Sequence, residues 1–130
     1  MAFYLSLMEE LNQNEEQIMA IFWAQGELLI RDVLDQIAEP KPPYTTLAST
    51  IKNIERKGYL THRMYGTVNI YKPAVNQEDY SKKSFNRLVT HFFGGSVGNF
   101  LSFMVKEKNI SDKEVKELQD MIDKMDEPSK

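Results

Sequence analysis

Residues 43–60 read PYTTLASTIKNIERKGYL, and this stretch decides the predicted fold. Leu47, Ile51 and Ile54 recur at helical spacing, so their side chains can face a core. The opposite side of such a helix carries hydroxyls, an amide and cations, which are the groups that bond base edges and phosphates in a DNA groove. The residues on that side are Thr45, Ser49, Lys52, Asn53 and Arg56. The stretch therefore predicts a DNA-reading helix over about residues 45–57.

The segments around this helix complete an ordered set of elements. A first helix is expected to begin at an asparagine cap, Asn12 or Asn14, and to end at Gly26. A second helix is expected over about residues 31–38, after a short apolar strand, and residues 60–73 alternate as a hairpin does. Three short helices followed by a hairpin make a winged helix-turn-helix. The fold class is therefore predicted to be mainly α with a small β-hairpin wing.

The region after residue 75 is predicted to be helical, with Gly94-Gly95 as a break and a capping box at Ser111 opening the last helix. Its apolar stripes are wide for about fifty residues, and a unit of that size has too small a core to be stable alone. Two copies packing together would bury the stripes, while packing back onto the N-terminal part of a monomer is the alternative. We prefer a homodimer, because two-fold symmetry lets a small protein bind a paired DNA site.

The sequence thus divides into a winged-helix DNA-binding domain, residues 1–75, and a helical dimerisation domain, residues 76–130. Loss of the dimer would reduce DNA affinity by orders of magnitude, because two linked contacts would become one. The side chains expected at the dimer contact are Phe85, Leu88, Val89, Phe92, Phe100, Leu101, Met104, Val115, Leu118, Met121 and Ile122.

Charge is unevenly distributed along the chain, although the net charge is only −3. Residues 1–40 hold eight acidic residues against Arg31 alone, whereas residues 41–73 hold six Lys and Arg residues against Glu55 alone. A basic segment on an acidic protein is an electrostatic footprint for nucleic acid. Chance clustering is the alternative, and the footprint is favoured because the basic segment contains the predicted DNA-reading helix.

Other function classes have little support. The chain has no cysteine, so it has neither a disulfide framework nor a thiolate metal site. His62 and His91 are too few and too isolated for a metal site, and we find no nucleophile with a base and no glycine-rich phosphate loop. No segment approaches the roughly 18 apolar residues that span a bilayer. We expect a cytoplasmic protein that is not an enzyme, needs no cofactor or metal and does not insert into a membrane.

The order and spacing of several short motifs resemble the penicillinase repressor family of bacterial transcription regulators, the BlaI/MecI type. The resemblance implies a dimeric repressor whose N-terminal winged helix reads half of an operator and whose C-terminal helices form the dimer. It covers about residues 11–122. The motifs that carry it are Leu11, Glu15, Met19 and Trp23, then Gly26, Arg31-Asp32-Val33, Tyr44-Thr45-Thr46, Lys57-Gly58-Tyr59-Leu60, Tyr71-Lys72-Pro73, Gly94-Gly95 and the segment from Ser111 to Leu118.

The resemblance also implies how such a repressor is released from DNA. In the better-studied members a membrane receptor senses a β-lactam and triggers cleavage in the dimerisation region, so a receptor–protease pathway is one implied partner. The cleaved bond of those members is Asn-Phe, whereas the matching position here is Phe103-Met104, and Asn99-Phe100 lies one helical turn earlier. A copper-sensing branch uses C-terminal cysteine pairs, which this sequence lacks.

The expected DNA contacts fall on the third helix and on the hairpin. The hydroxyl and amide groups of the helix are expected nearer the bases, while Lys52 and Arg56 would hold phosphates. The hairpin turn is predicted at Tyr65-Gly66, and side chains around it could touch the backbone, an ordinary solvated turn being the alternative. The full set of candidate DNA-binding residues is Tyr44, Thr45, Thr46, Ser49, Lys52, Asn53, Arg56, Arg63, Tyr65 and Thr67.

The resulting hypothesis is a sequence-specific repressor of transcription, acting as a homodimer on an inverted-repeat operator in double-stranded DNA with its third helix in the major groove. Two alternatives stay open. The winged helix could instead dock a protein partner, or the C-terminal phenylalanines could form a pocket that senses a ligand.

Overall fold

The computed structural model describes residue 5, residues 7–107 and residues 111–125, without the side chains of Ile122 and Met125. It divides into two compact units, Met1–Lys83 and Ser84–Lys130. The first unit contains the predicted winged helix, and the second contains the C-terminal helices.

The first unit opens with α2 (Gln13–Gln25), whose two ends are fixed by cap residues. The side chain of Asn12 accepts a hydrogen bond from the Glu15 amide at 2.8 Å, and the Glu15 carboxylate accepts one from the Asn12 amide at 2.9 Å. This capping box satisfies amides that have no partner within the helix. Gly26 closes the helix, with its N–H donating to the Phe22 carbonyl. Both predicted ends are confirmed, with Asn12 rather than Asn14 as the cap.

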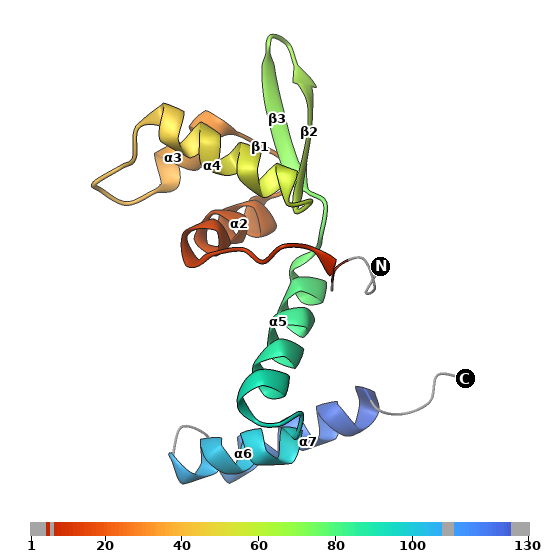
Figure 1. Cartoon of the computed structure of the whole chain (residues 1–130). Helices are drawn as coiled ribbons and strands as arrows, with labels where there is room; N and C mark the ends of the chain where they lie inside the picture. The colour runs from red at the N-terminus through yellow and green to blue at the C-terminus, as the bar shows by residue number, and fades with distance from the viewer. Residues whose placement is uncertain (1–4, 6, 108–110, 126–130) are drawn as a thin grey trace. The chain divides into compact units, whose positions relative to one another are not determined.

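A three-stranded antiparallel sheet in the order β1-β3-β2 belongs to the same unit. Its strands are β1 (Leu28–Leu29), β2 (Leu60–Tyr65) and β3 (Val68–Pro73). β1 adds a third strand to the predicted hairpin, because Leu28 pairs with Tyr71 and Leu29 pairs with Ile70. The hairpin projects beyond the helices as a wing (Figure 1), so most of β2 is exposed while Leu60 at its base is buried.

The hairpin turn differs from the prediction by one residue. Tyr65 pairs with Val68 and is the last residue of β2, so the turn consists of Gly66 and Thr67 rather than Tyr65-Gly66. Gly66 has a φ of 66°, a conformation that glycine adopts without steric cost. Alternation along the strands does not specify which residue takes this position, whereas a two-residue loop needs its glycine inside the turn.

Two further helices, α3 (Ile30–Gln36) and α4 (Tyr44–Arg56), pack with α2 around one core (Figure 1). α4 is the predicted DNA-reading helix, shifted by one residue toward the N-terminus. Gly58 follows it with a φ of 99°, and a methyl group added there would meet the Met8 side chain at 2.7 Å. The buried side chains of α4 are the three that their spacing predicted, Leu47, Ile51 and Ile54.

The first turns of α5 (Gln77–Phe92) also belong to the first unit. The Tyr80 ring packs against the rings of Trp23 and Tyr59, at centroid distances of 5.4 and 5.6 Å. The Trp23 indole N–H donates to the Val75 carbonyl at 2.8 Å. These contacts carry the first unit past residue 75, where the sequence placed a domain boundary.

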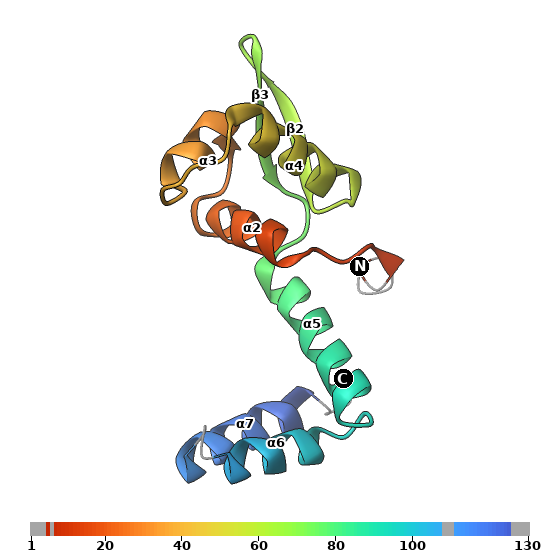
Figure 2. The same ribbon diagram turned by 60° about the vertical axis from the view of Figure 1, so that its left-hand side comes forward.

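The second unit comprises the rest of α5 with α6 (Val97–Lys106) and α7 (Asp112–Met125). α5 and α6 are separated at Gly94-Gly95, the predicted break. Ser111 caps α7, as predicted, by accepting a hydrogen bond from the Glu114 amide at 3.2 Å. α6 and α7 lie side by side (Figure 2).

Across the described ranges, no single helix is long and apolar enough to cross a membrane. The one combination that passes a test of length and composition is α5 with α6, which is bent by 83° at its break. The same residues hold no group of His, Asp or Glu side chains that could bind a metal ion.

Candidate nucleic-acid interface

The outward face of α4 carries short hydroxyl side chains and one lysine. Thr45, Thr46, Ser49 and Lys52 are exposed, and so is Tyr44 at the start of the helix. Within the described part of the chain, no ion pair involves Lys52. Because the apolar side of α4 is buried in the core, this face is turned outward and can contact a large ligand.

Two of the predicted contacts, Asn53 and Arg56, have partners within the protein. The half-buried Asn53 donates through Nδ2 to Glu15 Oε2 at 2.9 Å and accepts through Oδ1 from Arg56 Nε at 3.0 Å. Arg56 also forms a bidentate ion pair with Glu9, at 3.0 and 3.3 Å. The Arg56 guanidinium lowers the pKa of the Glu9 carboxyl from its ordinary value. These two side chains are therefore engaged internally, unlike those on the outward face.

Glu15 ties the start of α2 to the end of α4. It is only 1% exposed, and it accepts a hydrogen bond from Lys57 Nζ at 2.7 Å while Lys57 also donates to the Glu10 carbonyl at 2.8 Å. Burial alone raises the pKa of Glu15, but the hydrogen bonds from Lys57, the Asn12 amide and Asn53 outweigh it and leave the pKa lowered. An ionised carboxylate thus holds α4 in place. The sequence indicated only the capping role of Glu15, because its partners on α4 lie far along the chain.

On the wing, the cation is paired and the uncharged side chains are open. Arg63 forms a bidentate ion pair with Glu27, at 2.8 and 2.9 Å, and this hydrogen bonding lowers the pKa of Glu27. The Arg63 guanidinium also lies 5.8 Å from the centre of the Tyr65 ring. Tyr65 and Thr67 are exposed on either side of Gly66.

Folding neutralises much of the positive charge that the sequence concentrates in residues 41–73. Three of its six cations pair with acids from the first forty residues, as Arg56–Glu9, Lys57–Glu15 and Arg63–Glu27. Lys41 instead donates to the Leu34 and Ile37 carbonyls at the end of α3. Among the described residues of the first unit, the cations with no ion pair or hydrogen bond are Arg31, Lys52 and Lys72. Arg31 is a candidate that sequence reasoning missed, since it stands alone among acidic residues.

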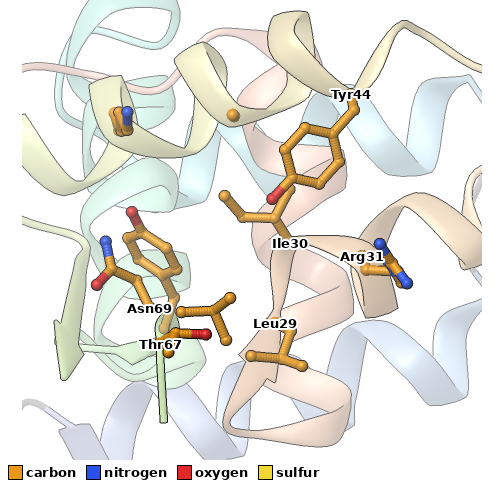
Figure 3. Close-up of a pocket in the computed structure, with 10 residues that line it drawn as sticks. Leu29, Ile30, Arg31, Tyr44, Thr67 and Asn69 are labelled. Atoms are coloured by element: carbon orange, nitrogen blue, oxygen red, sulfur yellow. The ribbon is translucent and has the colours of Figure 1, made fainter. Parts of the chain in front are cut away.

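A groove of about 540 Å³ lies between α4 and the wing, and no acidic residue lines it. Figure 3 shows the Tyr44 ring reaching from α4 toward Ile30, with Thr67 and Asn69 on the wing side and Arg31 on the other side. The groove therefore opens between the two elements that the sequence predicted to contact DNA.

Two of the unpaired cations, Arg31 and Lys52, line this groove. The buried Tyr71 also lines it, and burial raises the pKa of Tyr71, so its hydroxyl stays protonated at neutral pH. The lining thus combines positive charge, hydroxyl and amide groups with apolar walls.

The sequence matches the family model described as penicillinase repressor over residues 11–124. The chain belongs to this family. One relative, the penicillinase repressor of Bacillus licheniformis, is 22% identical over 119 residues, which cover 88% of this chain and 90% of that protein. Another, the methicillin resistance regulatory protein MecI of Staphylococcus aureus, is 19% identical over 116 residues, which cover 88% and 94%. The solution structure of the DNA-binding domain of the repressor BlaI shares 20% identity at a TM-score of 0.49, covering 56% of this chain and 90% of that one.

This member of the penicillinase repressor family exposes part of the apolar surface that was predicted to form a dimer contact. Phe92 is 76% exposed and Met121 is 59% exposed, and Leu88 is exposed as well. Val89 and Leu101 are instead buried within the second unit, so they pack inside one chain. The side chain of Ile122 lies outside the described residues. The half-buried members of the predicted set are Phe85, Phe100, Met104, Val115 and Leu118.

The bonds that the family resemblance drew attention to lie inside α6. Both Phe103-Met104 and Asn99-Phe100 fall between its first and last residues. Proteolysis concentrates in exposed loop segments, whereas a helix keeps its backbone hydrogen-bonded. Cleavage at either bond would therefore require α6 to unwind.

Proposed function

We propose that this chain is a homodimeric, sequence-specific DNA-binding repressor that recognises an inverted repeat through α4. The observation that carries the proposal is the outward face of α4, where Thr45, Ser49 and Lys52 are exposed and unopposed by acids in the described structure. Membership of the penicillinase repressor family supports it, since the relatives above are named as a repressor and a regulatory protein.

The dimensions of α4 suit the major groove of B-DNA. The helix has 13 residues, so it is about 20 Å long at 1.5 Å per residue, and the major groove admits a helix of ordinary diameter. In this arrangement Thr45, Thr46 and Ser49 contact base edges, and Lys52 contacts a phosphate. Tyr65 and Thr67 on the wing lie beside the backbone.

The second unit supplies the partner contact in this proposal. Its exposed Phe92 and Met121 are large apolar side chains that a second copy would cover. Two copies related by a two-fold axis would present two α4 helices to half-sites about 34 Å apart, or a multiple of that distance. Any release mechanism would then act on the dimer, because a single half-site contact is far weaker than two linked contacts.

The proposal is tested by selecting binding duplexes from a random pool with the purified full chain at a fixed salt concentration. We expect an inverted repeat to be enriched. The double variant Ser49→Ala, Lys52→Ala should lose retention of that duplex and remain dimeric by light scattering. The matched control is Lys82→Ala, which removes an exposed lysine paired with Glu78 on α5.

Two results would contradict the proposal. Enrichment of no motif would argue against sequence-specific reading. A monomer without affinity for any duplex would favour the alternative in which the winged helix docks a protein partner.

A further inference from the structure

We propose that the groove between α4 and the wing holds one strand of the DNA backbone, with Arg31 and Lys52 as its phosphate ligands. The inference rests on the proposed function and extends it. It adds Arg31, a residue of α3 rather than of the recognition helix or the wing, to the DNA contacts.

The distribution of unpaired charge selects this groove. A phosphate that approached Arg56 or Arg63 would meet the carboxylate already bound to that guanidinium, because both arginines form bidentate ion pairs. Arg31 and Lys52 have no such partner in the described structure, and both line the groove. A negatively charged strand therefore meets attraction without a neighbouring repulsion only along this path.

The uncharged lining also fits a phosphodiester strand. Phosphate oxygens in protein–DNA complexes commonly accept hydrogen bonds from threonine, asparagine and tyrosine side chains. Here Tyr44 supplies a hydroxyl from α4, while Thr67 and Asn69 supply a hydroxyl and an amide from the wing (Figure 3). Donors thus stand on both sides of a groove whose remaining lining is apolar and can pack against sugars.

The position of Arg31 gives the contact a consequence for register. Arg31 follows directly on β1, the strand that pairs with β3 of the wing. A phosphate bound by Arg31 and Lys52 is therefore held between the wing and α4, which fixes how the recognition helix sits along the groove. Phosphate contacts carry no sequence information themselves, but they position the side chains that read bases.

The test compares the salt dependence of binding to the selected duplex for single variants of the full chain. Removing one phosphate ligand lowers the slope of log K against log salt by about 0.9, which corresponds to about eightfold weaker binding at 0.1 M salt. We expect Arg31→Gln to show this reduction and Arg31→Lys to keep most of the slope. Arg63→Gln should reduce the slope less than Arg31→Gln, because Arg63 is already paired with Glu27. Lys82→Gln, which removes one positive charge elsewhere, should leave the slope unchanged.

A second measurement locates the site on the DNA. Replacing single phosphates by neutral methylphosphonates should reveal one position at which wild type binds more weakly and Arg31→Gln does not, since the variant already lacks the arginine that binds that phosphate. Trp23 fluorescence during thermal melting checks that the variant is folded. A slope for Arg31→Gln equal to that of wild type, with wild type binding normally, would overturn the groove site and leave the proposed function standing. Failure of wild type to bind any duplex would overturn both.

Discussion

The two units of this chain differ in how completely each one buries its own apolar surface. The first has a continuous core drawn from α2, α3, α4 and the sheet, with Met19, Phe22 and Val33 fully buried. In the described part of the second, Val89 and Leu101 are the buried hydrophobic residues, and Phe92 is 76% exposed. The first unit is thus complete as a single copy, whereas the second presents a surface that another copy can complete.

The second unit is nevertheless organised internally. The Phe93 ring contacts Phe100 and Phe103 at centroid distances of 5.4 and 5.6 Å, and Phe85 contacts Phe100 at 5.3 Å. This aromatic cluster joins α5 to α6 within one chain. The comparison teaches that reading and assembly place opposite demands on packing, because a reader needs a fixed scaffold and an assembly surface needs exposed apolar side chains.

The largest effect is expected where the first unit is tied together. Glu15→Gln leaves the Lys57 ammonium without its buried carboxylate, and breaking a buried ion pair from one side costs about 3 kcal/mol or more. Urea unfolding followed by the fluorescence of Trp23, the single tryptophan, measures this change in the free energy of unfolding. The control Asp35→Asn removes an exposed carboxylate and should change stability little. Equal stability of wild type and Glu15→Gln would show that the pair does not hold α4.

The next effect separates the two units. Phe92→Asp places a charge on the predicted dimer surface, so we expect monomers by sedimentation and about a hundredfold weaker operator binding through reduced avidity. Trp23-monitored stability should stay near that of wild type, since Phe92 lies outside the first unit. Thr90→Asp places the same charge at an exposed position of α5 away from this stripe and serves as the control. A Phe92→Asp variant that remains dimeric would locate the assembly surface elsewhere.

The pH dependence of stability sharpens the same contrast. The pKa of Glu15 is lowered in the folded protein from an ordinary value of 4.5. A lowered pKa contributes stability above the unfolded pKa, and this contribution is lost as the pH falls through the folded pKa. The stability difference between wild type and Glu15→Gln should therefore be constant at neutral pH and shrink below about pH 4.5. A difference that stays constant down to pH 3 would contradict an ionised Glu15.

The smallest expected effect concerns the paired arginines. Glu9→Gln removes the acid that holds Arg56, so a phosphate can compete for the guanidinium without repulsion. Because exposed ion pairs are weak and screened by salt, we expect operator binding to tighten by only about two- to threefold. Glu78→Gln removes an exposed carboxylate on α5 and should have no such effect. Weaker binding by Glu9→Gln would mean that Glu9 orients Arg56 toward DNA instead of withholding it.

Local patterns were enough to predict most of the first unit. The apolar spacing of Leu47, Ile51 and Ile54 located α4, and the asparagine cap and Gly26 located α2. Such signals are short-range, because a cap or a helical stripe involves residues within a few positions of one another.

Long-range pairing could not be predicted in the same way. Glu15 meets Lys57 across 42 positions and Arg56 meets Glu9 across 47, and no local pattern indicates which acid meets which cation. The apparent basic footprint of residues 41–73 was therefore larger in the sequence than on the folded surface. Arg31 was missed for the converse reason, since only the fold brings it to the groove beside Lys52.

The most direct test of the central claim is the stoichiometry and spacing dependence of binding to the selected operator. If two copies each present an outward α4 face, two chains should bind one duplex together. Inserting about five base pairs between half-sites should abolish joint binding by turning one half-site to the opposite side, and about ten should restore it. Binding of one chain per duplex, or equal affinity at every spacing, would contradict a symmetric pair of readers.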